Sequence, residues 1–207
     1  MEIIRRRQVI DAVVVILSAQ GWRDLTIREI SDVSGVSAGV ITHYFGAKQS
    51  IIADTINDVN QKVIGYLSAI EETSAATARL EGFVDLCVNH QAYGLPPPRY
   101  WMAVYGRSPF DAGILSEMQR LHGAITGFVQ RAIEAGVRGG GLRPVGPVED
   151  VAFEASALIY GQLIGSVLAA SEMPVERSRE ALTSALSGLV GATLEPRPVR
   201  VLGTDAL

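Results

Sequence analysis

The stretch LTIREISDVSGVSAGVITHYFGAKQSI, residues 25–51, predicts two short helices joined by a tight turn. Thr26 is a favourable N-cap for the first helix, and Glu29 three residues later completes a capping box. Gly35 is a natural end for that helix, because glycine adopts the left-handed conformation of a helix C-terminus without strain. Ser37 is then the expected N-cap of the second helix.

The spacing of apolar residues gives this helix pair an inner and an outer face. The residues expected inside are Ile27, Ile30, Val33, Val36, Ile41 and Phe45. The second helix then presents Ala38, Gly39, Thr42 and His43 outward, and small residues there would let a helix lie deep in a DNA major groove. The side chains of Ser37, Thr42, His43 and Tyr44 can donate hydrogen bonds to phosphates or base edges, and Lys48 adds a cation.

Helical periodicity continues along the rest of the chain, with no strand-like alternation. It predicts further helices at about 3–20, 47–70, 76–93, 97–106, 112–137, 147–172 and 175–193. The expected fold is therefore all-α, with about nine helices. From Glu195 onward the sequence predicts a flexible tail.

Charge is unevenly distributed along the chain. Residues 1–48 hold six Lys or Arg against five Asp or Glu, whereas the remainder holds twelve against seventeen. The N-terminal part is thus the least acidic region and the best electrostatic face for DNA. The single cysteine, Cys87, excludes an intramolecular disulfide and favours a reducing, cytoplasmic location. The uncharged stretch 155–171 is shorter than the roughly 20 residues that a membrane span needs, so we expect no membrane partner.

The helix pair resembles the DNA-binding domain of the TetR family of transcriptional repressors. The matching positions are Thr26, the turn Gly35-Val36-Ser37, Gly39, Phe45 and Lys48. The segments IRRRQVIDA (4–12) and ITHYF (41–45) look most like the choline-responsive BetI-type branch. Thr42 is a departure, because many relatives carry tyrosine at that position.

This resemblance implies a repressor that binds a palindromic double-stranded DNA operator as a homodimer and is released by a small-molecule effector. It implies a helix-turn-helix domain at 1–46, an effector-binding and dimerisation domain at 47–194, and a tail at 195–207. The implied DNA contacts are Thr26, Arg28, Ser37, Ala38, Gly39, Thr42, His43, Tyr44 and Lys48. Arg5, Arg6 and Arg7 are either a solvated face or an arm near the phosphates. The alternative function is a helical ligand-binding or interaction protein that kept the fold without binding DNA.

The last two helices support a dimer independently of the resemblance. Each has a long uncharged stretch, 155–171 and 181–194, which is more apolar surface than one packing face requires. Gly161 and Gly165 would allow close approach of a second helix, so that two helices from each subunit could form a four-helix interface. The predicted interface residues are Ala157, Gly161, Gly165, Leu168, Leu186 and Leu189.

Aromatic residues in the middle of the chain have two possible roles, an effector pocket or the core. Trp101 and Tyr105 share one helical face beside Met102, and they could begin an aromatic cage for a quaternary ammonium ligand. The candidate effector contacts are Phe83, Cys87, His90, Trp101, Met102, Tyr105, Phe128 and Tyr160.

The sequence contains no arrangement typical of catalysis. The histidines at 43, 90 and 122 are far apart, and neither a nucleophile elbow nor a phosphate-binding loop is present. Cys87 and His90 are a weak basis for a metal site, because no second pair of ligands accompanies them. We therefore expect no enzyme activity, no metal and no cofactor.

Overall fold

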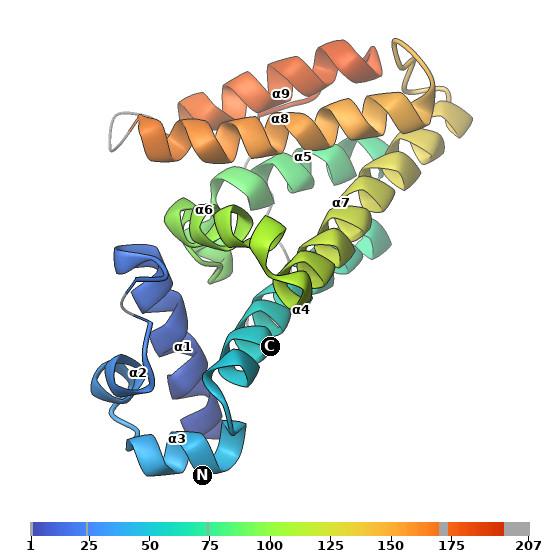
Figure 1. Ribbon diagram of the computed structural model, residues 1–207. Coiled ribbons are helices and arrows are strands. Elements are labelled where there is room, and N and C mark those ends of the chain that lie inside the picture. The colour runs from blue at the N-terminus through green and yellow to red at the C-terminus, as the bar shows by residue number, and fades with distance from the viewer. Residues whose placement is uncertain (1, 24, 74, 170–173, 197–207) are drawn as a thin grey trace. The chain divides into compact units, whose positions relative to one another are not determined.

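The computed structural model describes residues 2–23, 25–73, 75–169 and 174–196 (Figure 1). Within these ranges the chain forms nine α-helices and two short 3₁₀ helices, and no strand. The prediction of an all-α fold is confirmed. The chain divides into two compact units, Met1–Gln61 with Pro96–Gln119, and Lys62–Leu95 with Arg120–Leu207. We call them unit 1 and unit 2.

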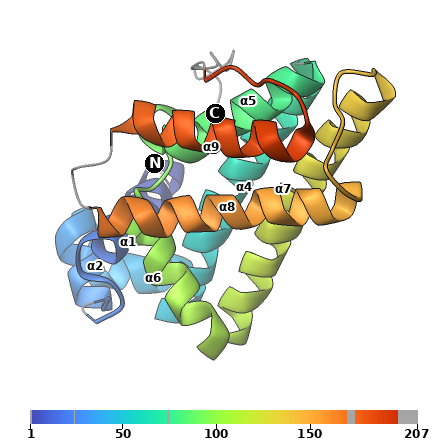
Figure 2. The ribbon, with the colours of Figure 1, turned by 90° about the horizontal axis from the view of Figure 1, so that it is seen from above.

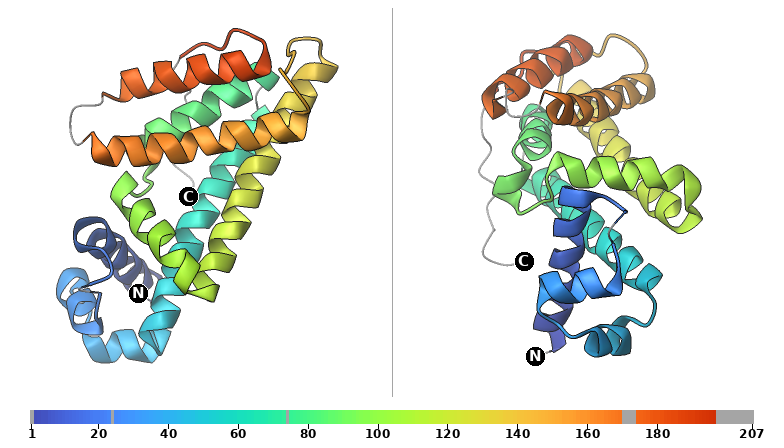
Figure 3. Two further views of the ribbon diagram at one scale, coloured as in Figure 1. Left: turned by 45° about the horizontal axis from the view of Figure 1, so that its top comes forward. Right: turned by 60° about the vertical axis from the view of Figure 1, so that its left-hand side comes forward.

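Unit 1 holds the N-terminal helices, which gather as one group in Figure 3. Its elements are α1 (Glu2–Gln20), α2 (Ile27–Ser34), α3 (Ala38–Phe45), the first part of α4 (Lys48–Thr73), α6 (Pro98–Arg107), the 3₁₀ helix η2 (Ser108–Phe110) and the start of α7 (Ala112–Arg138). Helix α1 is the centre of the unit, because α2 and α6 both pack against it.

The turn between α2 and α3 forms largely as its sequence predicts. The Thr26 Oγ1 atom accepts a hydrogen bond from the Glu29 N–H at 3.1 Å, which caps α2. Gly35 ends α2 with φ 67°, and its N–H donates to the Ser31 carbonyl. Ser37 occupies the N-cap position of α3, but its side chain makes no capping hydrogen bond.

One predicted core residue of α2 lies outside the core. Ile30 and Ile41 are fully buried, whereas Val33 is 43% exposed, so the prediction for Val33 is wrong. With about 3.6 residues per turn, Val33 is rotated by about 60° from Ile30 around the helix. A helix of eight residues contacts its neighbours along a narrow stripe, and Val33 falls beside that stripe.

Unit 2 contains two helices that lie side by side, the apolar α8 (Val148–Leu168) and α9 (Val175–Val190) (Figure 2). Helix α9 also packs against α5 (Ala76–Val88). The helix predicted at 76–93 ends earlier, because the chain leaves α-helical geometry at Asn89 and continues as the 3₁₀ helix η1 (His90–Tyr93). The remaining parts of α4 and α7 complete the unit.

The C-terminal predictions are covered only in part. Helix α8 ends at Leu168, and residues 170–172 of the predicted 147–172 helix lie outside the described residues. Of the predicted tail, Glu195 is described, and its N–H donates to the Glu81 carboxylate at 2.8 Å. Residues 197–207 lie outside the described residues.

A buried ion pair joins α9 to α5. The Arg179 guanidinium donates to one oxygen of Asp85, from Nη2 at 2.7 Å and from Nε at 3.2 Å. The Tyr93 hydroxyl donates to the other Asp85 oxygen at 2.8 Å, and the Tyr66 hydroxyl donates to the Tyr93 carbonyl. Burial, together with the hydrogen bond to Asp85, raises the pKa of Tyr93, so this phenol remains a donor at physiological pH. The network ties α4, α5, η1 and α9 together.

We predict that Asp85→Asn destabilises the protein by about 3–5 kcal/mol, because it leaves the Arg179 charge buried without a carboxylate. Urea unfolding measures the loss. The matched control is Glu71→Gln, which breaks the exposed Arg131–Glu71 pair and should cost about 0–1 kcal/mol. Equal losses in the two variants would contradict the role of burial.

Candidate nucleic-acid interface

The packing of α3 determines which of its side chains face solvent. Ile41 is fully buried beneath the helix, and Val36 in the preceding turn is buried as well. The opposite face is therefore exposed. Eight of the predicted DNA contacts are exposed residues of unit 1, namely Thr26, Arg28, Ser37, Ala38, Gly39, Thr42, His43 and Tyr44.

Two of the predicted donors are already bonded within the protein. The Thr42 hydroxyl donates to the Ala38 carbonyl of its own helix at 2.8 Å. The Lys48 ammonium, which is partly buried, donates to the Leu25 carbonyl at 3.1 Å, just before the N-cap of α2. Thr42 is thus no longer a donor toward a partner, whereas Lys48 has two further N–H groups.

The other donors of this face lie at the C-terminal half of α3. The His43 and Tyr44 rings contact each other edge to face, with centroids 5.2 Å apart and an interplanar angle of 71°. Both side chains are exposed. The ring N–H of His43 and the hydroxyl of Tyr44 can therefore reach a partner without a rearrangement of the core.

The backbone at the start of α3 is accessible. The Ser37 side chain accepts no hydrogen bond from the first N–H groups of α3. These N–H groups are therefore available to an anion, which the N-terminus of a helix attracts. Gly39 is exposed, and a Cβ atom built there would meet no heavy atom within 4 Å. Nothing inside the described protein thus requires glycine at this helical position.

The basic cluster at the N-terminus is engaged with α4. Arg6 pairs with Asp54 at 3.1 Å, and Arg7 pairs with Asp58 at 3.3 Å and with Asp11 at 2.9 Å. These side chains keep about half of their surface exposed. Arg6 and Arg7 therefore join α1 to α4, and this arrangement favours the solvated-face alternative over a phosphate-binding arm.

The candidate effector residues are divided between the two units. Trp101, Met102 and Tyr105 lie on α6 in unit 1, where Trp101 is 9% exposed and its ring centroid is 6.4 Å from that of Tyr105. The other five residues belong to unit 2. There, Phe83 and Phe128 pack on each other and are both buried, as core residues are.

Unit 2 also contains a polar pair that the sequence reasoning missed. The Tyr160 hydroxyl and the His122 Nδ1 atom are 2.7 Å apart and connect α8 to α7. Residues 38 positions apart give no local signal of such a contact.

Cys87 and His90 show no reactive character. Burial raises the pKa of the Cys87 thiol to about 12, and burial lowers the pKa of His90. Both groups are therefore neutral at physiological pH. Among the described residues, no three His, Cys, Asp or Glu side chains come together as metal ligands would.

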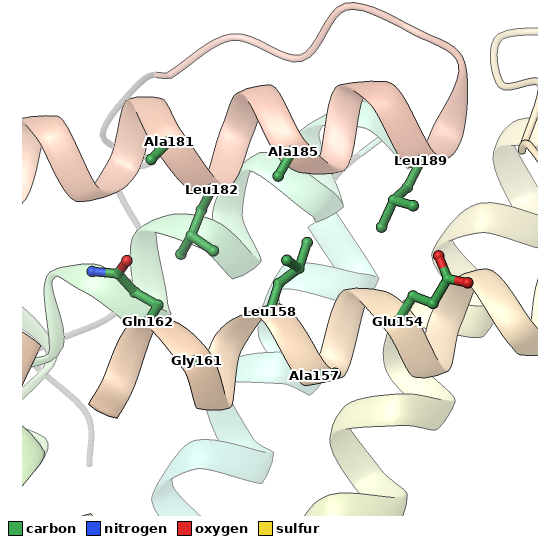
Figure 4. A pocket seen from close by; sticks show the side chains of 9 residues that line it. All are labelled: Glu154, Ala157, Leu158, Gly161, Gln162, Ala181, Leu182, Ala185 and Leu189. Carbon is green, nitrogen blue, oxygen red and sulfur yellow. The ribbon is translucent and has the colours of Figure 1, made fainter. Parts of the chain in front are cut away.

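The outer surface of α8 and α9 holds a groove of about 700 Å³ (Figure 4). It is lined by Glu154, Ala157, Leu158, Gly161, Gln162, Ala181, Leu182, Ala185 and Leu189. Three of the predicted dimer residues, Ala157, Gly161 and Leu189, line it. Leu168 is 79% exposed farther along α8, whereas Leu186 is buried inside unit 2 and is not among the residues that line the groove.

The sequence reasoning missed two large residues on this side of the protein. Phe153 and Ile164 on α8 are exposed, like Leu168. The positions 153, 157, 161, 164 and 168 repeat at intervals of three or four residues and share one helical face. That repeat would have identified them, because Phe153 lies one turn before Ala157 and Ile164 lies between the two glycines.

Helix α8 is also the one helix, within the described residues, that is long and apolar enough to cross a membrane. A single helix of this kind is a weak indication of a membrane span, because core helices of other proteins meet the same criteria.

Comparison with known proteins agrees with these features. Residues 9–55 match the family described as bacterial regulatory proteins, tetR family. Residues 69–191 match the family described as BetI-type transcriptional repressor, C-terminal. The HTH-type transcriptional regulator BetI of Escherichia coli is 33% identical over 112 residues, which are 52% of this chain and 57% of that protein. BetI of Klebsiella pneumoniae is 32% identical over the same shares. The aligned part thus spans little more than half the length of these relatives.

Solved structures share the fold at low identity. A TetR transcription regulator from Haloarcula marismortui has a TM-score of 0.77 at 18% identity, covering 92% of this chain and 98% of its own. A transcriptional regulator from Saccharomonospora viridis in complex with choline has a TM-score of 0.76 at 18% identity, covering 89% and 96%. Since the two family matches together span most of the chain and the larger covers more than half of it, the chain belongs to the TetR family of bacterial regulators, with a C-terminal part of the BetI type.

Proposed function

We propose that this protein is a transcriptional repressor that binds a palindromic operator as a homodimer and is released by a small-molecule effector. The observation that carries the proposal is the exposed face of α3, held outward by the buried Ile41. It combines small residues with hydrogen-bond donors on a helix that a major groove can admit. The family membership supports the same function.

The proposed contacts follow from what each side chain has available. Ser37, His43 and Tyr44 donate to phosphates or base edges, and Lys48 contributes charge while it remains bonded to the Leu25 carbonyl. Thr26 and Arg28 approach the backbone of the DNA from α2. Ala38 and Gly39 contribute by being small.

The proposed dimer interface is the outer side of α8 and α9. Helix α8 has large exposed residues, Phe153, Ile164 and Leu168, and α9 contributes small residues to the groove, Ala181 and Ala185. The groove could therefore receive large side chains of a second copy. A two-fold dimer would present two copies of α3 to successive major grooves of a palindrome.

The proposed effector binds the domain predicted at 47–194. It shifts the equilibrium from the conformation that binds DNA to one that does not. Choline is the first compound to test, because the chain has a BetI-type C-terminal part and a structural neighbour holds choline. Trp101 and Tyr105 on α6 are the proposed aromatic contacts for its ammonium group. The coupling is reciprocal, so operator DNA weakens effector binding by the same factor.

A gel-shift titration against the DNA upstream of the protein's own gene tests the function. We expect sequence-selective binding whose affinity falls steeply as salt rises, since phosphate contacts release counterions. Binding that does not distinguish this DNA from random DNA at any salt concentration would favour a ligand-binding protein that kept the fold.

We predict that Gly39→Ala stabilises the fold and yet weakens operator binding. Gly39 is the second residue of α3, where alanine in place of glycine gains up to about 1 kcal/mol, and the site is open within the protein. A methyl group pressed against DNA should lower affinity at least about fivefold, as overpacking costs about 1–3 kcal/mol. Urea unfolding and gel shifts measure the two effects.

Gly123→Ala is the matched control, because Gly123 is also exposed, helical and open, and lies on α7 in unit 2. Full DNA affinity in Gly39→Ala would remove Gly39 from the interface.

We predict that Leu168→Glu converts the dimer to a monomer in sedimentation experiments and thereby weakens operator binding, because it places a charge in an apolar interface. Phe110→Glu is the control, since Phe110 is similarly exposed, at 80%, but lies on η2 in unit 1. A dimer that survives Leu168→Glu would place the interface elsewhere.

We predict that Trp22→Phe weakens the effect of the effector on DNA binding. The Trp22 indole N–H donates to the Ala103 carbonyl at 2.7 Å and so connects the turn after α1 to α6. Loss of one neutral hydrogen bond should reduce the coupling factor about 2- to 10-fold. The ratio of choline affinities with and without operator measures this factor. Ser108→Ala is the control, because it removes a hydrogen bond to the Tyr105 carbonyl without touching α1. Identical coupling factors in the wild type and Trp22→Phe would argue against this connection.

A further inference from the structure

Thr42 stands on the exposed face of α3 with its hydroxyl hydrogen turned into the helix. Its Oγ1 atom donates to the Ala38 carbonyl at 2.8 Å. A threonine hydroxyl has one hydrogen, so a partner can use only the methyl group and the oxygen lone pairs. This side chain is therefore an apolar group with an acceptor, in contrast to the donors on His43 and Tyr44.

The surroundings of Thr42 leave its methyl group accessible. Ala38 and Gly39, one turn earlier, are both exposed and carry at most a methyl group. No heavy atom lies within 4 Å of the position that a Gly39 Cβ would take. A flat base edge can thus approach Thr42 without meeting a larger neighbour on that side.

The base edges of the major groove differ in how they match such a group. Guanine offers only acceptors there, at N7 and O6, which oppose an acceptor oxygen. A phosphate oxygen is likewise an acceptor and gains nothing from this hydroxyl. Adenine and cytosine offer amino donors that could bond the Thr42 oxygen, whereas thymine alone carries the C5 methyl group, which is the natural partner of a threonine methyl. Recognition through the oxygen would be lost in Thr42→Val, whereas recognition through the methyl group would be kept.

We propose that Thr42 is a specificity-determining residue that selects thymine at one position of each half-site through contact between the two methyl groups. The proposal rests on the proposed operator binding. It assigns base selection to the apolar part of Thr42, and hydrogen bonding to His43 and Tyr44.

The experiment uses the full-length protein and proceeds in two stages. Selection from random duplex DNA by the wild type first defines the operator. Each thymine of one half-site is then replaced by uracil, which lacks only the methyl group, and affinities are measured for the wild type, Thr42→Val and Thr42→Ser. Valine keeps the methyl group without the hydroxyl, and serine keeps the hydroxyl without the methyl group. Urea unfolding establishes that both variants are folded.

We expect one thymine at which uracil lowers the affinity of the wild type and of Thr42→Val about fourfold, as loss of one buried methyl group implies. Thr42→Ser should already have lost about the same factor on the thymine operator and should not distinguish uracil from thymine there. The proposal is overturned if Thr42→Val loses the base preference while Thr42→Ser retains it, or if every uracil substitution affects the wild type and Thr42→Ser equally. If the wild type selects no sequence at the first stage, the operator-binding function itself fails, and the proposal with it.

Discussion

The burial of Ile41 and Ile30 beneath α3 and α2 is the constraint on which the proposed interface depends. Each of these helices has eight residues, and helices shorter than about 12 residues are marginal in water on their own. Their stability therefore comes from tertiary packing, of α2 on α1 and of α3 on α2. The same packing that makes α3 a helix decides that Thr42 and His43 face outward. The same packing thus determines both the stability of α3 and the direction in which its exposed face points.

A different interaction plays the equivalent part in unit 2. The buried Asp85–Arg179 pair joins α9 to α5, and the hydroxyl of Tyr93 occupies the second carboxylate oxygen. Such a pair adds little net stability relative to an apolar replacement, because desolvation offsets much of its attraction, whereas removal of one partner is costly. It orients α9 so that Arg179 and Leu186 point inward. Ala181 and Ala185 are then left on the groove side, where the proposed partner docks.

The local features of the helix-turn-helix could be predicted from sequence because they depend on residues a few positions apart. The Thr26 cap and the left-handed Gly35 turn are examples. Predictions were less successful where the outcome depends on how neighbours cover a helix. Val33 has apolar spacing, yet it lies beside the contact stripe, and the helix expected to reach residue 93 ends at Val88. On α8 the glycines were recognised, but the exposed Phe153 and Ile164 were not.

The sequence by itself determined the helical fold, the turn at Gly35 and the composition of the α3 face, because periodicity and glycine conformation act locally. Only the tertiary structure decided which donors on or near that face are already used. Lys48 bonds a carbonyl 23 residues earlier, Arg6 and Arg7 pair with aspartates about 50 residues away, and Asp85 meets Arg179 across 94 residues. Even the local hydrogen bond from Thr42 to the Ala38 carbonyl could not be predicted from the sequence, because a threonine hydroxyl can turn either toward its helix or toward a partner. A donor forms a hydrogen bond with whichever acceptor the fold brings within about 3 Å, and the spacing of residues along the sequence does not predict which acceptor that is.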